Sequence, residues 1–408
     1  MSTLLRSILT PAALTRLAVG WLTFLAVLAA GPLLAPPVPT PLLIGALLVI
    51  IAVILLCAFG VVGEAEHLAR RLGDPYGSLV LTLSIVAIEV ILISAVMLGP
   101  GDHTTIARDS VMAVSMIILN LVIGLSLLVG GIRHGGLAHN RTGTSAYLAM
   151  IVVLASLAFA LPAAIGTDGA YAPAQEIPIV VLTVAVYAFF LYRQMGAQAG
   201  DFREVDSRFL ATAEVTERMP VTGRGGAAPT AELAGTTSAT GSTSGGSAES
   251  ISQILAEHKS EVLLRIGLLV ATVLPIVLLS HDMAALLDDG LGRLGAPVAL
   301  SGILIAMIVF LPESITSLRG ALGGEIQRVS NLCHGALVST VGLTIPSVLV
   351  IGLLTGQQVV LAESPVNLLL LGVTLLLSVA TFSAKRVTAT HGAAHLAVFA
   401  VYGLAVFA

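Results

Sequence analysis

Long apolar runs dominate this chain of 408 residues and limit what it can fold into. Each run has about 17–25 residues, which is enough for an α-helix to cross a bilayer. Hydrophobic residues make up 56% of the chain and charged residues only 10%, far below the share of charged residues in an average soluble domain. The sequence therefore predicts an all-α polytopic membrane protein with about eleven transmembrane helices. The expected spans lie near residues 15–35, 42–60, 78–98, 110–132, 145–165, 176–195, 261–280, 294–318, 329–354, 365–382 and 391–407.

The basic residues support this number of spans. When the N-terminus is placed in the cytoplasm and the spans alternate, 17 of the 19 Lys and Arg residues fall on the cytoplasmic side. Only Arg108 and Arg293 fall outside. A missing or extra span would mix the two sides, so the asymmetry favours both the count and a multi-pass orientation with the N-terminus in the cytoplasm and the C-terminus outside.

Two of the apolar runs carry a carboxylate. Glu89 lies near the middle of Leu79–Leu98, and Glu313 lies in Leu304–Leu318. A charged carboxylate at the bilayer centre costs about 3 kcal/mol on insertion scales, so such groups are rare and are usually functional. Glu313 stands only shortly before Leu318, so it can lie at the membrane midplane only if its helix bends at Pro312 or continues past Arg319.

The two glutamate spans occupy matching places in two halves of the chain. A long hydrophilic segment rich in Gly, Ser, Thr and Ala divides the chain and predicts a flexible cytoplasmic linker. Five spans precede it, after one extra span, and five follow it, and the glutamate span is the second of each five. Because these two spans run in opposite directions, the pattern is that of an inverted-repeat transporter. The expected boundaries are 1–38 for the extra helix, 39–196 for the first repeat with its site helix at 78–98, 197–260 for the linker, and 261–408 for the second repeat with its site helix at 294–318.

Two carboxylates that meet in a membrane can be neutralised by two protons or by one calcium ion. Because the two modes exclude each other, such a pair has the chemistry that antiport requires. Calcium prefers six to eight oxygen ligands. The sequence offers Ser84 on the first glutamate helix and Thr340 on the helix after Glu313. A serine or threonine in a helix commonly bonds back to its own backbone instead.

Asn120 and Asn331 each begin an N-L-x-x-G motif on the helix that follows a glutamate helix. Their amide oxygens could ligate a cation, or their side chains could hold neighbouring helices together. His334 lies one turn from Asn331 and could relay protons or simply pack between helices. No soft or imidazole-rich ligand set points to zinc or copper, and no cofactor motif is present in the sequence.

Two sequence blocks carry a resemblance to a known family. They are GEAEHLARRLGDPYGSLVLTLSIVAIEVILISAVML at 63–98 and FLPESITSLRGALGGEIQRVSNLCHGALVSTVGLTIP at 310–346. The chain resembles the calcium/cation antiporter superfamily and, within it, the ChaA-like branch of bacterial calcium/proton and sodium/proton antiporters. The resemblance implies ten core helices in two inverted repeats, with Glu89 and Glu313 as the cation- and proton-binding carboxylates. Many members have Gly-Asn or Gly-Asp before the glutamate, whereas Ile88 and Pro312 stand there in this chain.

The expected function is secondary active transport in a bacterial inner membrane, with cytoplasmic Ca²⁺, or Na⁺ or K⁺, exchanged for external protons. The cations are substrates rather than cofactors, and no partner other than the lipid bilayer is indicated; no basic cluster points to nucleic acid. A sodium-driven Na⁺/Ca²⁺ exchanger and a cation channel are the alternatives. An enzyme is not expected, because no nucleophile or metalloprotease motif accompanies the glutamates. The sequence leaves the oligomeric state open.

Overall fold

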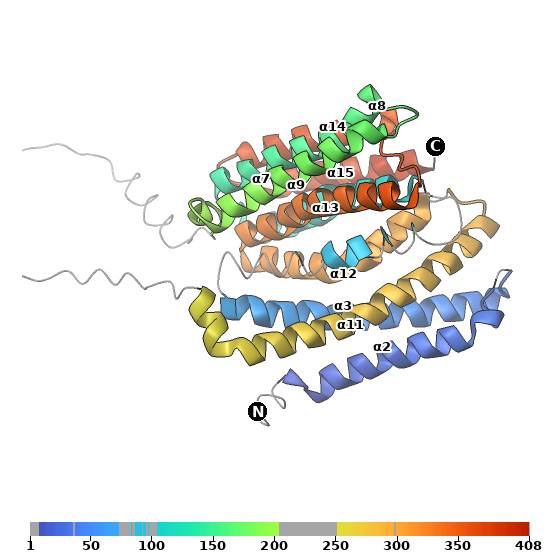
Figure 1. Ribbon diagram of the computed structural model, residues 1–408. Helices are drawn as coiled ribbons and strands as arrows, with labels where there is room; N and C mark the ends of the chain where they lie inside the picture. The colour runs from blue at the N-terminus through green and yellow to red at the C-terminus, as the bar shows by residue number, and fades with distance from the viewer. Residues whose placement is uncertain are drawn as a thin grey trace, which may run out of the picture. The chain divides into compact units, whose positions relative to one another are not determined.

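The computed structural model describes residues 8–35, 37–72, 83, 86–91, 93–94, 97, 104–203, 251–297 and 299–407 (Figure 1). The described residues are helical apart from short connections and three isolated β-bridges. The elements are α2 (Pro11–Ala29), η1 (Gly31–Leu33), α3 (Thr40–Leu72), α5 (Ile106–Met116), η2 (Ile117–Val122), α6 (Ile123–His134), α7 (Arg141–Ala155), η3 (Ser156–Ala160), α8 (Leu161–Ile165), α9 (Pro173–Met195), η4 (Ala199–Phe202), α11 (Ile251–Arg293), α12 (Ala299–Gly323), α13 (Ile326–Thr355), α14 (Pro365–Ser383) and α15 (Ala389–Val406). The expected all-α fold is confirmed.

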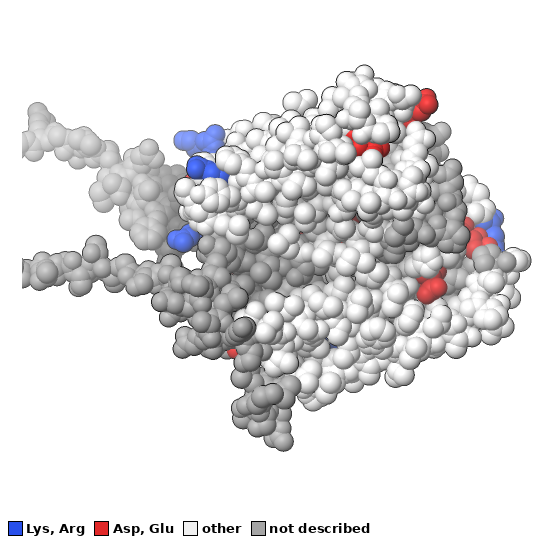
Figure 2. All heavy atoms as spheres, in the orientation of Figure 1, with Lys and Arg blue, Asp and Glu red and all other residues white. Residues whose placement is uncertain are grey.

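Nine helices in the described part of the chain are long and apolar enough to cross a membrane, and the bent helix α12 brings the number to ten. Most of the third expected span, 78–98, lies outside the described residues. On the face drawn in Figure 2, the described surface between the two ends of the helices is almost entirely uncharged, as lipid contact requires. The chain is therefore a multi-pass membrane protein.

Local sequence explains several helix ends. The Asn140 side chain accepts hydrogen bonds from the first backbone amides of α7, and Ser364 caps α14 in the same way. Gly135 after α6 and Gly356 after α13 have positive φ angles of 72° and 71°, which a residue with a Cβ adopts at a cost. These caps place the connections at the ends of the spans, where water can satisfy the remaining polar groups.

Helix α11 is longer than the expected span 261–280. The segment SHDMAALLDDG was expected to interrupt the chain, but it continues the helix to Arg293. Met283 and Leu286 are buried on its inner face, so burial of these side chains favours the extra turns. Asp289 pairs with Arg293 and accepts a hydrogen bond from the backbone of Val38. Asp288 and Asp289 therefore lie within a helix rather than in a loop.

The chain divides by its contacts into one compact unit of Met1–Val205 with Ser260–Ala408, and a second unit of Asp206–Lys259. Of the expected linker, residues 204–250 lie outside the described residues. Residues 199–202 form the short helix η4, and α11 already begins at Ile251.

The described part of the first unit contains two large hydrophobic clusters, beside a small one of Ile8, Ala13 and Leu268. One joins α2, α3 and α11 through side chains such as Ile54 and Leu279. The other joins α5 to α9 with α12 to α15 through side chains such as Phe159, Phe310 and Leu349. Both expected glutamate helices take part in this unit, Ile88 in the first cluster and Phe310 in the second.

Helices α6 and α15 approach so closely that only glycine fits at their contact. A Cβ on Gly392 would lie 2.3 Å from the backbone nitrogen of Leu128, and one on Gly131 would lie 2.2 Å from that of Ala389. Small residues at such crossings are typical of membrane helices. The close packing brings the end of the chain against the helix that carries Asn120.

Helix α12 bends by 55° between Leu300–Ile308 and Phe310–Gly323. The bend lies beside Pro312, which cannot donate a backbone hydrogen bond and clashes with the preceding turn. The helix also continues past Arg319 to Gly323. Both conditions that the sequence set for placing Glu313 inside the membrane are thus met.

Candidate functional site

Glu89 lies on the described helical stretch 86–91, and its side chain is buried, with the residue only 3% exposed. The hydroxyl of Thr340 on α13 donates a hydrogen bond of 2.5 Å to Glu89 Oε2. The two residues are 251 positions apart in the sequence. The fold therefore joins one candidate from each half of the chain, a contact that their sequence positions alone could not give.

Glu313 on α12 is 5% exposed, and neither of its carboxylate oxygens has a hydrogen-bond partner. Glu89 Oε1 is also buried without a partner. The two side chains lie within electrostatic range of each other, so their charges repel. In the described part of the chain, neither carboxylate forms an ion pair.

This arrangement leaves three buried carboxylate oxygens without compensation. Burying an isolated carboxylate is strongly unfavourable unless a proton, a cation or hydrogen-bond donors neutralise it. In the described part of the chain, the one hydrogen bond that the pair receives comes from the Thr340 hydroxyl.

Most other hydroxyls on the glutamate helices are already used. Ser94, Ser314 and Thr316 each donate to the carbonyl four residues earlier in their own helix. Thr344 differs, because it is fully buried on α13 and its hydroxyl has no partner. It lies one turn from Thr340 and so shares the face of α13 that meets Glu89. Ser84, whose hydroxyl was predicted as a possible cation ligand, lies outside the described residues.

Asn120 lies in η2, a short π-helical segment within the long helix formed by α5, η2 and α6. Its amide donates a hydrogen bond of 2.8 Å to Thr374 on α14, and its oxygen lies 3.3 Å from His395 Nδ1 on α15. His395 Nε2 lies 3.2 Å from the hydroxyl of Thr381. Asn120 therefore connects three helices, which matches the alternative that it holds helices together.

Asn331 also has protein partners. Its amide donates to the backbone oxygen of Phe202 in η4, and its oxygen accepts from Gln327 one turn earlier. None of these contacts involves a glutamate of the pair. The matched N-L-x-x-G motifs thus place their asparagines in different surroundings.

His334 is fully buried in an aromatic cluster rather than hydrogen-bonded to the glutamates. Its ring stacks on Tyr147, with centroids 6.1 Å apart, and meets Phe382 edge-on at 5.0 Å. Nδ1 lies 2.9 Å from the hydroxyl of Ser330, while Nε2 is buried without a partner. In the described part of the chain, the titratable groups in electrostatic range of His334 are His395 and His139.

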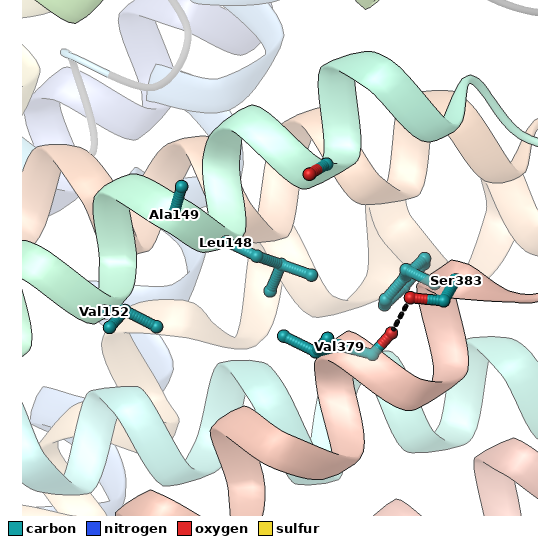
Figure 3. Close-up of a pocket in the computed structure, with 7 residues that line it drawn as sticks. Leu148, Ala149, Val152, Val379 and Ser383 are labelled. Carbon is teal, nitrogen blue, oxygen red and sulfur yellow. Dashed lines mark hydrogen bonds between the residues drawn. The ribbon is translucent and has the colours of Figure 1, made fainter.

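A cavity of about 350 Å³ lies between α7 and α14, away from the glutamates (Figure 3). Its lining is apolar, with Leu148 and Val152 on α7 facing Val379 on α14. The hydroxyl of Ser383 is occupied by a 2.6 Å hydrogen bond to the Val379 carbonyl. Among the described residues, this lining contains no charged side chain, and its polar side chains are those of Ser145 and Ser383.

Comparison with known proteins now gives the family. Residues 42–196 match the family model described as sodium/calcium exchanger protein. The chain is 30% identical over 371 residues to the sodium-potassium/proton antiporter ChaA of Escherichia coli (strain K12), covering 90% of each chain. It is 32% identical over 347 residues to y4hA of Sinorhizobium fredii (strain NBRC 101917 / NGR234), covering 84% of this chain and 83% of that one. The chain belongs to the calcium/cation antiporter superfamily. Within the superfamily, its relative ChaA marks the branch that the sequence predicted.

Solved structures agree on the fold. The H⁺/Ca²⁺ exchanger CAX superposes with a TM-score of 0.64 at 14% identity, over 97% of this chain and 89% of that one. The sodium/calcium exchanger NCX_Mj gives a TM-score of 0.54 at 14% identity, over 90% and 99%. The fold is therefore that of polytopic cation exchangers, and this chain is a membrane transporter of cations rather than an enzyme.

Sequence reasoning missed two polar groups. One is the link from Asn120 to Thr374 and His395, and the other is a carboxylate cluster around Glu363 and Arg108. The partners in both are more than 250 residues apart, so no spacing rule could pair them. The apolar context of His395 and Glu363 was the only available signal.

Proposed function

We propose that this transporter is a secondary active cation/proton antiporter whose substrates compete at Glu89 and Glu313. It exchanges a cytoplasmic cation, Ca²⁺ or Na⁺ or K⁺, for external protons. The observation that carries the proposal is the pair of buried carboxylates with three unpartnered oxygens and no fixed cation among the described residues. Its relative ChaA, a sodium-potassium/proton antiporter, supports the same interpretation.

The mechanism follows from charge. With both carboxylates ionised, the pair repels itself in a medium of low dielectric constant, so the empty and doubly charged state is unfavourable. Protons relieve the repulsion when the site opens to the more acidic side, and a cation relieves it when the site opens to the other. Because both use the same oxygens, one must leave before the other enters, which couples their movements.

The ligand set that we propose centres on Glu89, Glu313 and the hydroxyl of Thr340. Thr344 is added because its buried hydroxyl is free on the same face of α13. Ser84 remains a predicted ligand. We assign Asn120 and Asn331 to helix contacts, since their side chains already have partners on other elements.

The proton-relay role predicted for His334 remains a prediction. Nε2 is buried without a partner, and the titratable groups in electrostatic range of the ring are His395 and His139. Replacement by Gln, which keeps the polar size, would slow proton-coupled transport if the ring carries protons and would leave it unchanged if it only packs.

The orientation is proposed with the N-terminus in the cytoplasm. Figure 1 shows α2 beginning at one end of the helices and α15 ending at the other, as an odd number of crossings requires. The distribution of Lys and Arg then selects the cytoplasmic end. The inverted-repeat arrangement is proposed on the same basis, and the family-model match at 42–196 supports a first repeat near 39–196.

The decisive experiment measures proton exchange in everted membrane vesicles. Adding Ca²⁺, Na⁺ or K⁺ across a range of pH should dissipate a pH gradient made by respiration, and the most effective cation identifies the substrate. Glu89→Gln and Glu313→Gln should abolish the response. Glu325→Gln is the matched control, since Glu325 is half exposed and pairs only with Arg328 at the surface. Full activity in both site variants would contradict the proposal.

Sodium-driven calcium exchange is the alternative that the family description favours. It predicts calcium uptake driven by a sodium gradient at a clamped pH, with no change in the pH gradient. A channel predicts neither form of coupling. The same vesicles therefore distinguish all three functions.

A further inference from the structure

A second cavity, of about 490 Å³, lies between α5, α14 and α15 and, unlike the first, is lined partly by polar side chains. It is remote in sequence from the glutamate pair and shares no residue with it. The polar side chains that line it are those of Asp109, Glu363, Ser364, Asn367 and Tyr402. All of these offer oxygen atoms, and no Lys or Arg lines the cavity.

Glu363 is buried, with a side-chain exposure of only 2%. Its Oε2 is satisfied, because it accepts hydrogen bonds from Asn367 Nδ2 at 2.8 Å and from the backbone nitrogen of Ser364 at 3.0 Å. Its Oε1 is buried without a hydrogen bond. A carboxylate oxygen that lines a cavity in this state is an open position for a positively charged ligand.

The nearest fixed cation does not fill that position. Arg108 Nε lies 4.0 Å from Glu363 Oε1, and the same nitrogen donates a 2.9 Å hydrogen bond to Asp109 Oδ1. Arg108 Nη1 is bound to the carbonyl of Ala362. Asp109 Oδ2 is bound to the hydroxyl of Thr105. With one guanidinium and two carboxylates, the cluster keeps a formal charge of −1.

We propose that this cavity binds a hard metal cation, held by Glu363 Oε1 and completed by the other oxygens of the lining and by water. Oxygen-only surroundings suit Na⁺ and Ca²⁺ rather than zinc or copper. The phenol of Tyr402 lies within electrostatic range of both Glu363 and Asp109. Since no group of three acidic, histidine or cysteine side chains forms a metal cluster in the described residues, water supplies much of the shell. Binding at about millimolar concentration is then expected, as in weak extracellular calcium sites.

The place of the cavity suggests what the cation does. The cavity lies where α5 and α14 begin and α15 ends. In the orientation proposed above, these ends face the external solution. A cation there would be taken from outside, where exported cations accumulate. The assignment of the cavity to the external side of the membrane therefore rests on the proposed function, whereas the proposal that it binds a cation does not.

The test uses Tb³⁺, a calcium-sized cation whose luminescence is excited by energy transfer from a nearby tyrosine. The full chain is purified with Glu89→Gln and Glu313→Gln, so that the glutamate pair cannot contribute. Tyrosine-excited Tb³⁺ emission should saturate, and Ca²⁺ or Na⁺ should displace it according to which cation the cavity prefers. Tyr402→Phe should remove most of the emission, because Tyr402 is the tyrosine among the described residues that line this cavity.

Glu363→Gln should weaken Tb³⁺ binding at least tenfold, and Arg108→Gln should strengthen it, a gain that misfolding cannot produce. Glu325→Gln serves as the unaffected carboxylate. Unchanged Tb³⁺ affinity in both Glu363→Gln and Arg108→Gln would overturn the proposal. Because transport is already disabled in this background, the result does not depend on whether the antiport proposal holds.

Discussion

The two carboxylate sites of this molecule differ in what neutralises them. At Glu89 and Glu313, a single hydroxyl serves four carboxylate oxygens, and no fixed cation is present in the described part of the chain. At Glu363 and Asp109, the carboxylates receive one hydrogen bond from the Arg108 guanidinium and three from other protein groups, which leaves one oxygen open. Glu89, Glu313 and Glu363 are buried, whereas the side chain of Asp109 is 28% exposed.

This difference teaches how a fold separates exchange from binding. A fixed Arg lowers the gain from taking up a cation, so we expect the Glu363 cluster to depend less on an added cation than the glutamate pair does. The glutamate pair has no such partner, so its neutral states require protons or a cation. Coupled exchange requires the empty, doubly charged state to be unstable. A site that is stable when empty could change sides without binding either a proton or a cation.

The largest effect is expected where no fixed partner exists. Glu313→Gln and Glu89→Gln should each lower cation/proton exchange on the order of 100-fold, since ligand charge tunes cation affinity over decades. Glu363→Gln should lower it less than tenfold. Initial rates of pH-gradient collapse in everted vesicles give the comparison, with protein amounts matched by immunoblot. Equal losses at the two sites would remove the distinction drawn between them.

The next effect concerns the only hydroxyl that serves the pair. Thr340→Val keeps the shape but deletes the donor to Glu89, and a buried hydrogen bond to a charged group contributes about 1.5–3 kcal/mol. The apparent affinity for the cation should fall about tenfold. Thr340→Ser, which keeps the hydroxyl, should restore most of it. If Ser and Val behave alike in cation titrations of vesicles, the bond has no part in binding.

Removing the guanidinium of Arg108 should make the cluster of Glu363 and Asp109 resemble the glutamate pair. Arg108→Gln leaves Glu363 without its only nearby positive charge, so the protein should lose stability when no cation is added. We expect a fall in melting temperature of about 1 °C, the change that roughly 1 kcal/mol gives in a chain of this size. Millimolar Ca²⁺ should reverse the fall in the variant and have less effect on the parent. A fall that Ca²⁺ cannot reverse points to lost packing instead.

The smallest expected effect concerns the loss of stability in acid that arises from His139, a residue outside both carboxylate sites. His139 lies in the connection between α6 and α7, where burial lowers the pKa of its ring. Its Nε2 binds the Phe382 carbonyl at 2.9 Å, and Nδ1 has no partner. Because the pKa is lower in the folded state, stability is complete above about pH 6.5 and declines as the pH falls further.

His139→Phe should therefore flatten the acid side of the stability profile by less than about 1 kcal/mol. Melting temperatures between pH 7 and pH 5 provide the measurement. His134→Phe, at an exposed position at the end of α6, is the control and should leave the slope unchanged. A steeper acid slope in His139→Phe would show that the charged ring is stabilised rather than opposed.

The sequence predicted the features that depend on local composition. Apolar runs of bilayer length gave the helical membrane fold, because any other backbone would leave polar groups unpaired in lipid. The expense of an intramembrane carboxylate singled out Glu89 and Glu313. Pro312 gave the place of the bend in α12, since its missing donor and its ring act on the helix that carries it.

The sequence was less informative wherever a partner came from far along the chain. It treated Asn120 and Asn331 as equivalents, yet one bonds α14 and α15 and the other bonds η4. It ended the seventh span too early, because the burial that stabilises the later turns of α11 is a tertiary property.

The sequence by itself determined that this protein spans a membrane many times and that two carboxylates, Glu89 and Glu313, lie within apolar runs. Only the tertiary structure decided that Thr340 donates a hydrogen bond to Glu89 and that Arg108 pairs with Glu363. It also decided that Glu313 has no fixed cation beside it among the described residues. The physical reason is that hydropathy acts on each helix separately, whereas charge compensation depends on distances between helices. Those distances follow from close packing, such as that of Gly131 against Ala389, which no local pattern specifies.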